Sequence, residues 1–134
     1  MSNSHSGPFI LGYTPTPQGE AALHLAVTQA QTHKAALLVV NVSRAESYVD
    51  TNLAEESQLK ALHDTLQASG LKHEIIQHIG RDPATDILDV ANRREAAMII
   101  LGLRRRSAVG KLLLGSTAQN ILLNADCPVL TVRA

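Results

Sequence analysis

The chain has 134 residues, 45% of them hydrophobic and 18% charged, and its 12 basic and 12 acidic side chains cancel. This length and composition fit one globular domain with one core and exclude a disordered chain. The zero net charge argues against nucleic-acid partners, and no apolar run reaches the roughly 20 residues of a membrane span. Cys127 is the single cysteine, so it has no partner for an internal disulfide. We therefore expect a cytoplasmic protein with neither nucleic-acid nor membrane partners.

The amino-terminal part of the chain predicts a tail, a strand and a helix. Residues 1–7 form a flexible polar tail, and the apolar run 9–13 is a short buried strand that ends in the turn 14–17. Thr16 is placed to cap the next helix, and Pro17 to take its first position. The apolar face of this helix consists of Ala22, Leu25, Ala26 and Ala30.

The middle of the chain predicts two strands around a second helix. The run 35–42 is apolar on both faces, which is typical of a parallel sheet covered by helices. A polar loop over 43–50 leads to a helix that Gly70 ends. The apolar stripe of this helix consists of Leu59, Leu62 and Leu66. Residues 73–79 alternate more strongly, which indicates an edge strand.

The carboxyl-terminal part continues the alternation. Asp82 is predicted to cap a third helix with Pro83 in its first position. The buried face of that helix consists of Ala84, Ile87, Leu88 and Ala91. A buried strand over 96–101 and a glycine-containing loop over 102–115 follow. Residues 116–119 form a capping box that opens the last helix. Its apolar stripe consists of Ala118, Ile121, Leu122 and Ala125.

A final strand over 127–132 completes the order βαβαβαβαβ. Such alternation predicts a parallel sheet with helices on both faces, and right-handed crossovers restrict it to a doubly wound α/β fold. Ligands of these sheets bind beyond the carboxyl ends of the strands, where the strand order reverses. The candidate loops therefore follow Tyr13, Val42, Ile79 and Leu101.

The loop after Leu101 suits an anion. Its two glycines allow the backbone to approach a ligand, its hydroxyl pair opens a helix whose N–H groups favour negative charge, and its arginines are permanent cations. The alternative is that the arginines are a solvated loop surface and that the glycine and serine only cap a helix. The residues concerned are Gly102, Arg104, Arg105, Arg106, Gly115, Ser116 and Thr117.

No catalytic or metal-binding set is evident. Cys127 is better explained as a small core residue than as a nucleophile, and Ser116 lies in no GxSxG elbow. Asp82 and Asp86 lie four apart, but Asp82 is better explained as a cap than as half of a carboxylate pair. The histidines lack the spacing of a zinc site, which predicts helix-surface or edge positions for His24, His33, His63, His73 and His78. We therefore expect that the protein is not an enzyme.

The spacing of Gly102, Gly115 and Ser116 resembles the nucleotide loop of the universal stress protein family. The pattern of that family is Gly, two residues, Gly, nine residues, Gly, then Ser or Thr. Arg105 stands at the second glycine of the pattern. Thr14 stands where the family has an aspartate that contacts the nucleoside. The resemblance covers about residues 8–133, including the turn 80–83 and the segment 127–129, and implies a universal stress protein domain over 8–134.

The resemblance also implies a Rossmann-like, five-stranded sheet of order 3-2-1-4-5, with the cleft between the first and fourth strands. It implies ATP or AMP as ligand, with Mg²⁺ accompanying ATP. The end of the second strand would offer backbone to the base. The nucleotide site would consist of Tyr13, Thr14, Pro15, Val40, Val42, Gly102, Arg104, Arg105, Gly115, Ser116 and Thr117. The family often forms a homodimer by pairing its last strands, here Val129 to Val132.

Two alternatives to nucleotide binding stay open. In the first, the protein is an interaction module that keeps the fold and uses the arginine loop to dock a protein or another anionic partner, and the changes at Thr14 and Arg105 favour this hypothesis. In the second, it is a slow ATPase, which would need a base and a metal ligand near the phosphates. The sequence shows neither group.

Overall fold

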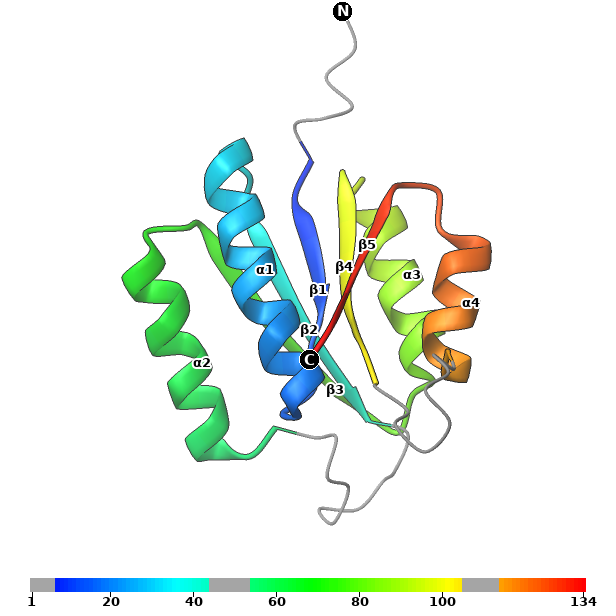
Figure 1. Cartoon of the computed structure of the whole chain (residues 1–134), viewed down its shortest axis with the longest axis horizontal. Coiled ribbons are helices and arrows are strands. Elements are labelled where there is room, and N and C mark those ends of the chain that lie inside the picture. Colours follow the sequence, from blue (N-terminus) through cyan, green and yellow to red (C-terminus); the bar gives the residue numbers. More distant parts are fainter. Residues whose placement is uncertain (1–6, 44–53, 105–113) are drawn as a thin grey trace, which may run out of the picture.

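The computed structural model describes residues 7–43, 54–104 and 114–134. In this part of the chain, strands and helices alternate along one α/β domain (Figure 1). The elements are β1 Phe9–Gly12, α1 Pro17–His33, β2 Leu37–Ser43, α2 Glu56–Ser69, β3 His73–Ile79, α3 Pro83–Arg93, β4 Met98–Leu103, α4 Ser116–Asn124 and β5 Val129–Arg133. None of the helices described is both long and apolar enough to cross a membrane.

The sheet has the predicted doubly wound topology. Its five strands are parallel in the order β3-β2-β1-β4-β5. Leu11 of β1, at the centre, pairs with Val39 of β2 on one side and with Ile100 of β4 on the other. Figure 1 shows α1 and α2 on one face of the sheet and α3 and α4 on the other. The predicted strand order is confirmed.

The sheet divides the apolar interior into two layers. Leu11 and its neighbours in β2 and β4 point toward α1 and α2, where Ala26 and Leu62 are buried against them. Ile10 lies in the opposite layer, together with Ile87 of α3 and Ile121 of α4. Successive side chains of a strand point to opposite faces, so the central strands are apolar throughout. The prediction of one core is therefore wrong in detail, because each face of the sheet has its own.

The predicted helix boundaries mostly follow from local caps. Thr16 Oγ1 accepts a hydrogen bond from Gly19 N at 3.1 Å, and Pro17 is the first residue of α1. Asp82 caps α3 by accepting from Thr85 N at 3.0 Å. Gly70 ends α2 with a φ of 77°, a left-handed conformation that glycine adopts at little cost. These three predictions are confirmed.

The predicted apolar faces of α1 and α3 pack against the core, whereas the start and the outer face of α4 differ from the prediction. In α1, Leu23 is buried while Leu25 is only partly buried. In α3, Leu88 is only partly buried as well. Gly115 is the N-cap of α4 and Ser116 its first helical residue, so the predicted capping box does not form. Leu122 of α4 is 40% exposed, because only Ile121 of this short helix is buried against the sheet layer.

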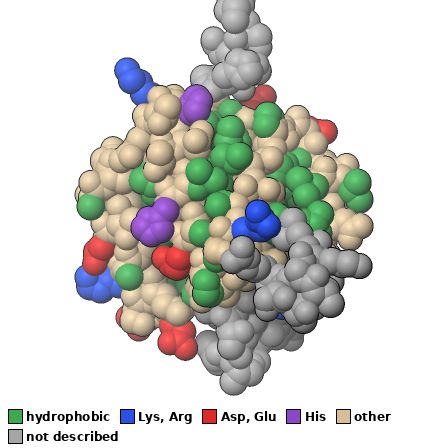
Figure 2. All heavy atoms as spheres, in the orientation of Figure 1, with side chains coloured by type: hydrophobic (Ala, Val, Ile, Leu, Met, Phe, Trp, Pro, Cys, Tyr) green, Lys and Arg blue, Asp and Glu red, His purple; other side chains and the backbone are tan. Residues whose placement is uncertain are grey.

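The last strand lies at an edge of the sheet. Among the described strands β5 pairs with β4 alone, and both strands extend past their predicted ends because Gly102 and Leu103 pair with Val132 and Arg133. The side chains of Val129 to Val132 are half-buried. Hydrophobic side chains are exposed on the face of the molecule that carries β5 (Figure 2). This edge is therefore open to pairing by backbone and by apolar contact.

Candidate functional site

A cleft lies at the point where the strand order reverses. The helix after β1 covers one face of the sheet and the helix after β4 covers the other, so their connections part above the carboxyl ends of these neighbouring strands (Figure 1). A cavity of about 350 Å³ opens there, which we call the switch-point cleft. The described residues that line it are 12–14, 18, 19, 40, 42, 83, 87, 101–104 and 114–118.

Most residues of the predicted site meet in this cleft. Those that line it are Tyr13, Thr14, Val40, Val42, Gly102, Arg104, Gly115, Ser116 and Thr117. They come from four separate stretches of the chain that only the folded sheet brings together. Pro15 is an exception, because it lines a different cleft, between α1 and α2. Arg105 and Arg106 lie outside the described residues.

The turn after β1 forms one wall of the cleft. Thr14 Oγ1 lies 2.8 Å from Thr16 Oγ1, which also accepts from Gly19 N, so a hydroxyl pair closes the turn. Thr14 is neutral, and none of the described residues that line the cleft is Asp or Glu. Arg104, exposed at the end of β4, is the charged side chain among them. The field in this cleft therefore favours an anion.

The two motif glycines have different reasons to be glycine. A Cβ on Gly102 would lie 2.0 Å from the carbonyl oxygen of Gln18, so β4 approaches α1 too closely for any side chain. Gly102 therefore has a packing reason to be glycine, and its predicted role in giving a ligand access to the backbone stays a prediction. A Cβ on Gly115 would meet nothing within 4 Å, and its φ of −67° suits any residue. Packing within the described protein does not require glycine at 115.

The amino terminus of α4 faces the cleft. Gly115 caps the helix without a side chain, and Ser116 and Thr117 follow in its first turn. The first N–H groups of a helix have no acceptor within the helix, and the helix dipole adds partial positive charge there. Together with Arg104, which lines the same cleft, this helix end suits a phosphate or carboxylate group.

An asparagine that sequence reasoning missed holds the turn after β1. Asn41 of β2 is fully buried, and its Nδ2 donates to the carbonyl oxygen of Tyr13 at 2.9 Å. Its Oδ1 accepts from Ala54 N at 2.8 Å and from Gln77 Nε2 at 3.0 Å. Asn41 thus joins β1, β3 and the start of α2. The polar residue inside the apolar run 37–42 was the available signal.

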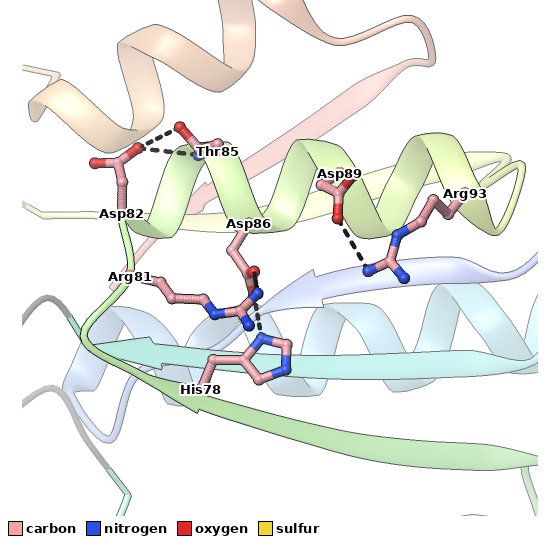
Figure 3. A network of polar contacts seen from close by, with 7 residues as sticks. All are labelled: His78, Arg81, Asp82, Thr85, Asp86, Asp89 and Arg93. Carbon is pink, nitrogen blue, oxygen red and sulfur yellow. Dashed lines mark hydrogen bonds and ion pairs between the residues drawn. The ribbon is translucent and has the colours of Figure 1, made fainter.

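A buried carboxylate anchors the wall formed by α3. Asp86 is 4% exposed, and its carboxylate lies 2.6 Å from His78 Nδ1 and accepts from Arg81 Nη1 at 3.1 Å (Figure 3). The prediction that His78 is a plain edge residue missed this contact. Asp86 lies between Pro83 and Ile87, which both line the cleft. The network therefore fixes the first turn of α3 against β3.

Tyr13 and Cys127 have shifted pKa values. Burial raises the pKa of the Tyr13 phenol well above its usual value, and the Glu20 carboxylate, which accepts a hydrogen bond from that hydroxyl, raises it further. Burial, with the neighbouring Asp126, also raises the pKa of the Cys127 thiol. A thiol that stays protonated is a poor nucleophile, which agrees with a packing role for this half-buried residue. Across ranges 7–43, 54–104 and 114–134, no cluster of three His, Cys, Asp or Glu side chains could hold a metal.

A parallel sheet of order 3-2-1-4-5 with a cleft at its switch point defines a Rossmann-like α/β protein. Comparison with known sequences then narrows the class. The model of the universal stress protein family matches residues 7–133. A universal stress protein from Mycolicibacterium smegmatis is 36% identical over 124 residues, which are 92% of this chain and 95% of that protein. The chain therefore belongs to the universal stress protein family.

Solved structures agree on the fold. A universal stress protein from Archaeoglobus fulgidus superimposes with a TM-score of 0.76 at 24% identity, covering 93% of this chain and 97% of the other. A structure from the same organism in complex with dAMP gives a TM-score of 0.68 at 20% identity, covering 95% and 98%. At these identities, the similarity establishes the architecture.

Proposed function

We propose that the protein binds an adenine nucleotide, AMP or ATP, in the switch-point cleft. The observation that carries the proposal is the amino terminus of α4, where Gly115 leaves the helix end open beside Arg104. No acidic side chain is among the described lining residues to repel a phosphate. The dAMP complex of the Archaeoglobus fulgidus protein adds support, because its fold has the same switch point.

The cleft offers a suitable place for each part of a nucleotide. Its volume of about 350 Å³ lies in the range of small-molecule sites, roughly 300–1,000 Å³. The phosphate would lie against the amides of the α4 terminus, paired with Arg104. Val40, Val42 and Ile87 supply apolar surface for the base. Mg²⁺ would arrive with ATP, because the described lining offers hydroxyls from Ser116 and Thr117 but no carboxylate ligand.

The proposal is binding without turnover. Hydrolysis would need a group that activates water, and none of the described residues lining the cleft is His, Asp, Glu or Lys. Without a general base in reach, the bound nucleotide stays intact. This suits a protein that responds to whether the nucleotide is bound. We expect no phosphate release above the uncatalysed rate.

Isothermal titration of nucleotide-stripped protein tests the proposal. We expect saturable binding of AMP, and of ATP with Mg²⁺, that Gly115→Ala weakens roughly tenfold, about 1.4 kcal/mol, because its methyl group enters the phosphate position. The fold should tolerate this change, since the new Cβ meets no described atom. Absence of heat for both nucleotides at millimolar concentration would overturn the proposal.

A second candidate is an interaction module for an anionic partner. Arg104 is exposed and makes no ion pair with the described residues, so it is available to a partner surface. This alternative predicts binding of an acidic peptide that AMP does not displace. Displacement by AMP would place both ligands in the cleft and favour the nucleotide proposal.

We also propose that the chain forms a homodimer through β5. Among the described strands β5 pairs only with β4, and its half-buried side chains pack against both layers, Leu130 and Val132 on one face of the sheet and Val129 on the other. Hydrophobic groups are exposed on the side of the molecule that carries this strand (Figure 2). Pairing two such edges would satisfy both backbones. Light scattering after gel filtration should give twice the 14.4 kDa of one chain, and Thr131→Pro should give a monomer. A monomeric wild-type protein would contradict the proposal.

A further inference from the structure

A second cleft lies on the other side of the turn after β1. It has a volume of about 430 Å³ and opens between the first turns of α1 and the facing side of α2. We call it the α1–α2 cleft. Pro15 and Pro17 form its rim, Glu20 and Leu23 come from α1, and Ala61 and Thr65 come from α2.

Small side chains on α2 keep this cleft open. Ala61 and Thr65 lie four residues apart on one face of the helix, directed toward α1, and both are exposed. The larger Leu62 lies beside them, 2% exposed, and forms the floor with Leu23, which is 3% exposed. The cleft thus has an apolar floor, and Gln58 of α2, whose side-chain oxygen accepts from Glu55 N, also lines it.

The polar end of the cleft is acidic. Glu20 is exposed, and its carboxylate accepts a hydrogen bond from the buried hydroxyl of Tyr13. An ionised carboxylate has about four acceptor positions, and Tyr13 is the one described residue that donates a hydrogen bond to the Glu20 carboxylate. The described residues lining the cleft include no Lys, Arg or His. Glu20 is therefore held in place by Tyr13 while its remaining acceptor positions are open to a ligand.

We propose that the α1–α2 cleft binds a small amine with an apolar body, whose ammonium group pairs with Glu20. The apolar part lies on Leu23 and Leu62, between the prolines of the rim. An anion of the same shape is rejected, because it would meet the Glu20 carboxylate with no Lys, Arg or His among the described lining residues to compensate. The binding is weak, in the millimolar range, because a partly exposed ion pair adds little to the apolar contact. This site does not depend on the nucleotide proposal.

Tryptamine and indole-3-propionate are suitable probes, because they share the indole ring and carry opposite charges. We expect saturable NMR shifts for the amides and methyl groups of Leu23, Ala61 and Leu62 with tryptamine. The anion at the same concentration should give none. Glu20→Gln should weaken tryptamine binding about two- to fivefold, the range expected for an exposed ion pair. Equal shifts with both probes, or an unchanged affinity in Glu20→Gln, would overturn the proposal.

A filling variant tests the location. Ala61→Leu places a large side chain in the cleft and should abolish the tryptamine shifts. Ala68→Leu is the matched control, because Ala68 is exposed on the same helix but does not line the cleft. Ala68→Leu should bind as the wild type does. Wild-type binding by Ala61→Leu would place the amine elsewhere and overturn the proposal, and AMP titration of both variants tests the switch-point cleft separately.

Discussion

The switch-point cleft and the α1–α2 cleft lie on opposite sides of one turn and have opposite charge. Arg104 and the amino terminus of α4 face the switch-point cleft, and the described residues that line it include no Asp or Glu. Glu20 faces the second cleft, and the described residues that line it include no Lys, Arg or His. Tyr13 lines both. A net charge of zero therefore says little about ligands, because the local field of each cleft selects them.

The two clefts also differ in origin. The switch-point cleft lies where the connections after β1 and β4 turn to opposite faces, so the topology of the sheet provides its place. The α1–α2 cleft exists because Ala61 and Thr65 are small, so one larger side chain would remove it. Topology places the first cleft, whereas side-chain volume makes the second one easy to gain or lose.

The largest expected effect is on stability. Gly102→Ala forces its new Cβ to within 2.0 Å of the Gln18 carbonyl oxygen. Overpacking of this kind costs about 3 kcal/mol or more of unfolding free energy, measured by urea denaturation. Gly115→Ala is the control, with a change within about 1 kcal/mol. Equal stability of the two variants would mean that packing does not distinguish the two motif glycines.

Asn41→Ala should disturb both clefts together. It removes the donor to Tyr13 and leaves the Ala54 N–H without its acceptor, which costs about 1–3 kcal/mol for the buried group. Because Tyr13 is a wall of both clefts, we expect weaker binding of AMP and of tryptamine. Titration of each ligand checks this. Loss of one ligand alone would mean that the shared turn does not depend on Asn41.

Arg104→Ala should affect the switch-point cleft alone. A charge-assisted hydrogen bond to phosphate contributes about 1.5–3 kcal/mol, so the dissociation constant of AMP should rise about 10- to 100-fold. Tryptamine binding should not change. Arg93→Ala is the matched control, since Arg93 pairs with Asp89 on the outer surface of α3. An equal loss in Arg93→Ala would point to general electrostatics rather than to a site.

The smallest effect concerns Tyr13 and appears at high pH. Its pKa is raised by burial and by Glu20, whereas in the unfolded chain tyrosine titrates near pH ~10. The stability from this group is therefore complete below that pH and is lost as the pH rises through the higher folded pKa. Tyr13→Phe should cost about 1 kcal/mol at neutral pH and lose less stability above pH ~10 than the wild type. Parallel alkaline denaturation curves for the two proteins would contradict this.

Much of the fold was predictable because its signals are local. Thr16 with Pro17, and Asp82 with Pro83, begin helices through contacts within one turn, and Gly70 ends one through its own backbone. The apolar runs that became β1, β2 and β4 are buried on both faces, which explains their uninterrupted pattern. The family resemblance correctly implied the strand order, and the spacing of Gly102, Gly115 and Ser116 indicated the loop that lines the cleft.

Contacts between distant segments were decided only by the tertiary structure. The burial of Asp86 was not predicted, because its partner His78 belongs to another element. Pro15 was assigned to the nucleotide site, but the turn directs it to the opposite cleft. Leu122 kept the helical spacing of a buried residue, yet α4 buries only Ile121. Periodicity gives the direction of a side chain around its own helix, whereas burial and charge pairing depend on what the completed sheet places opposite it.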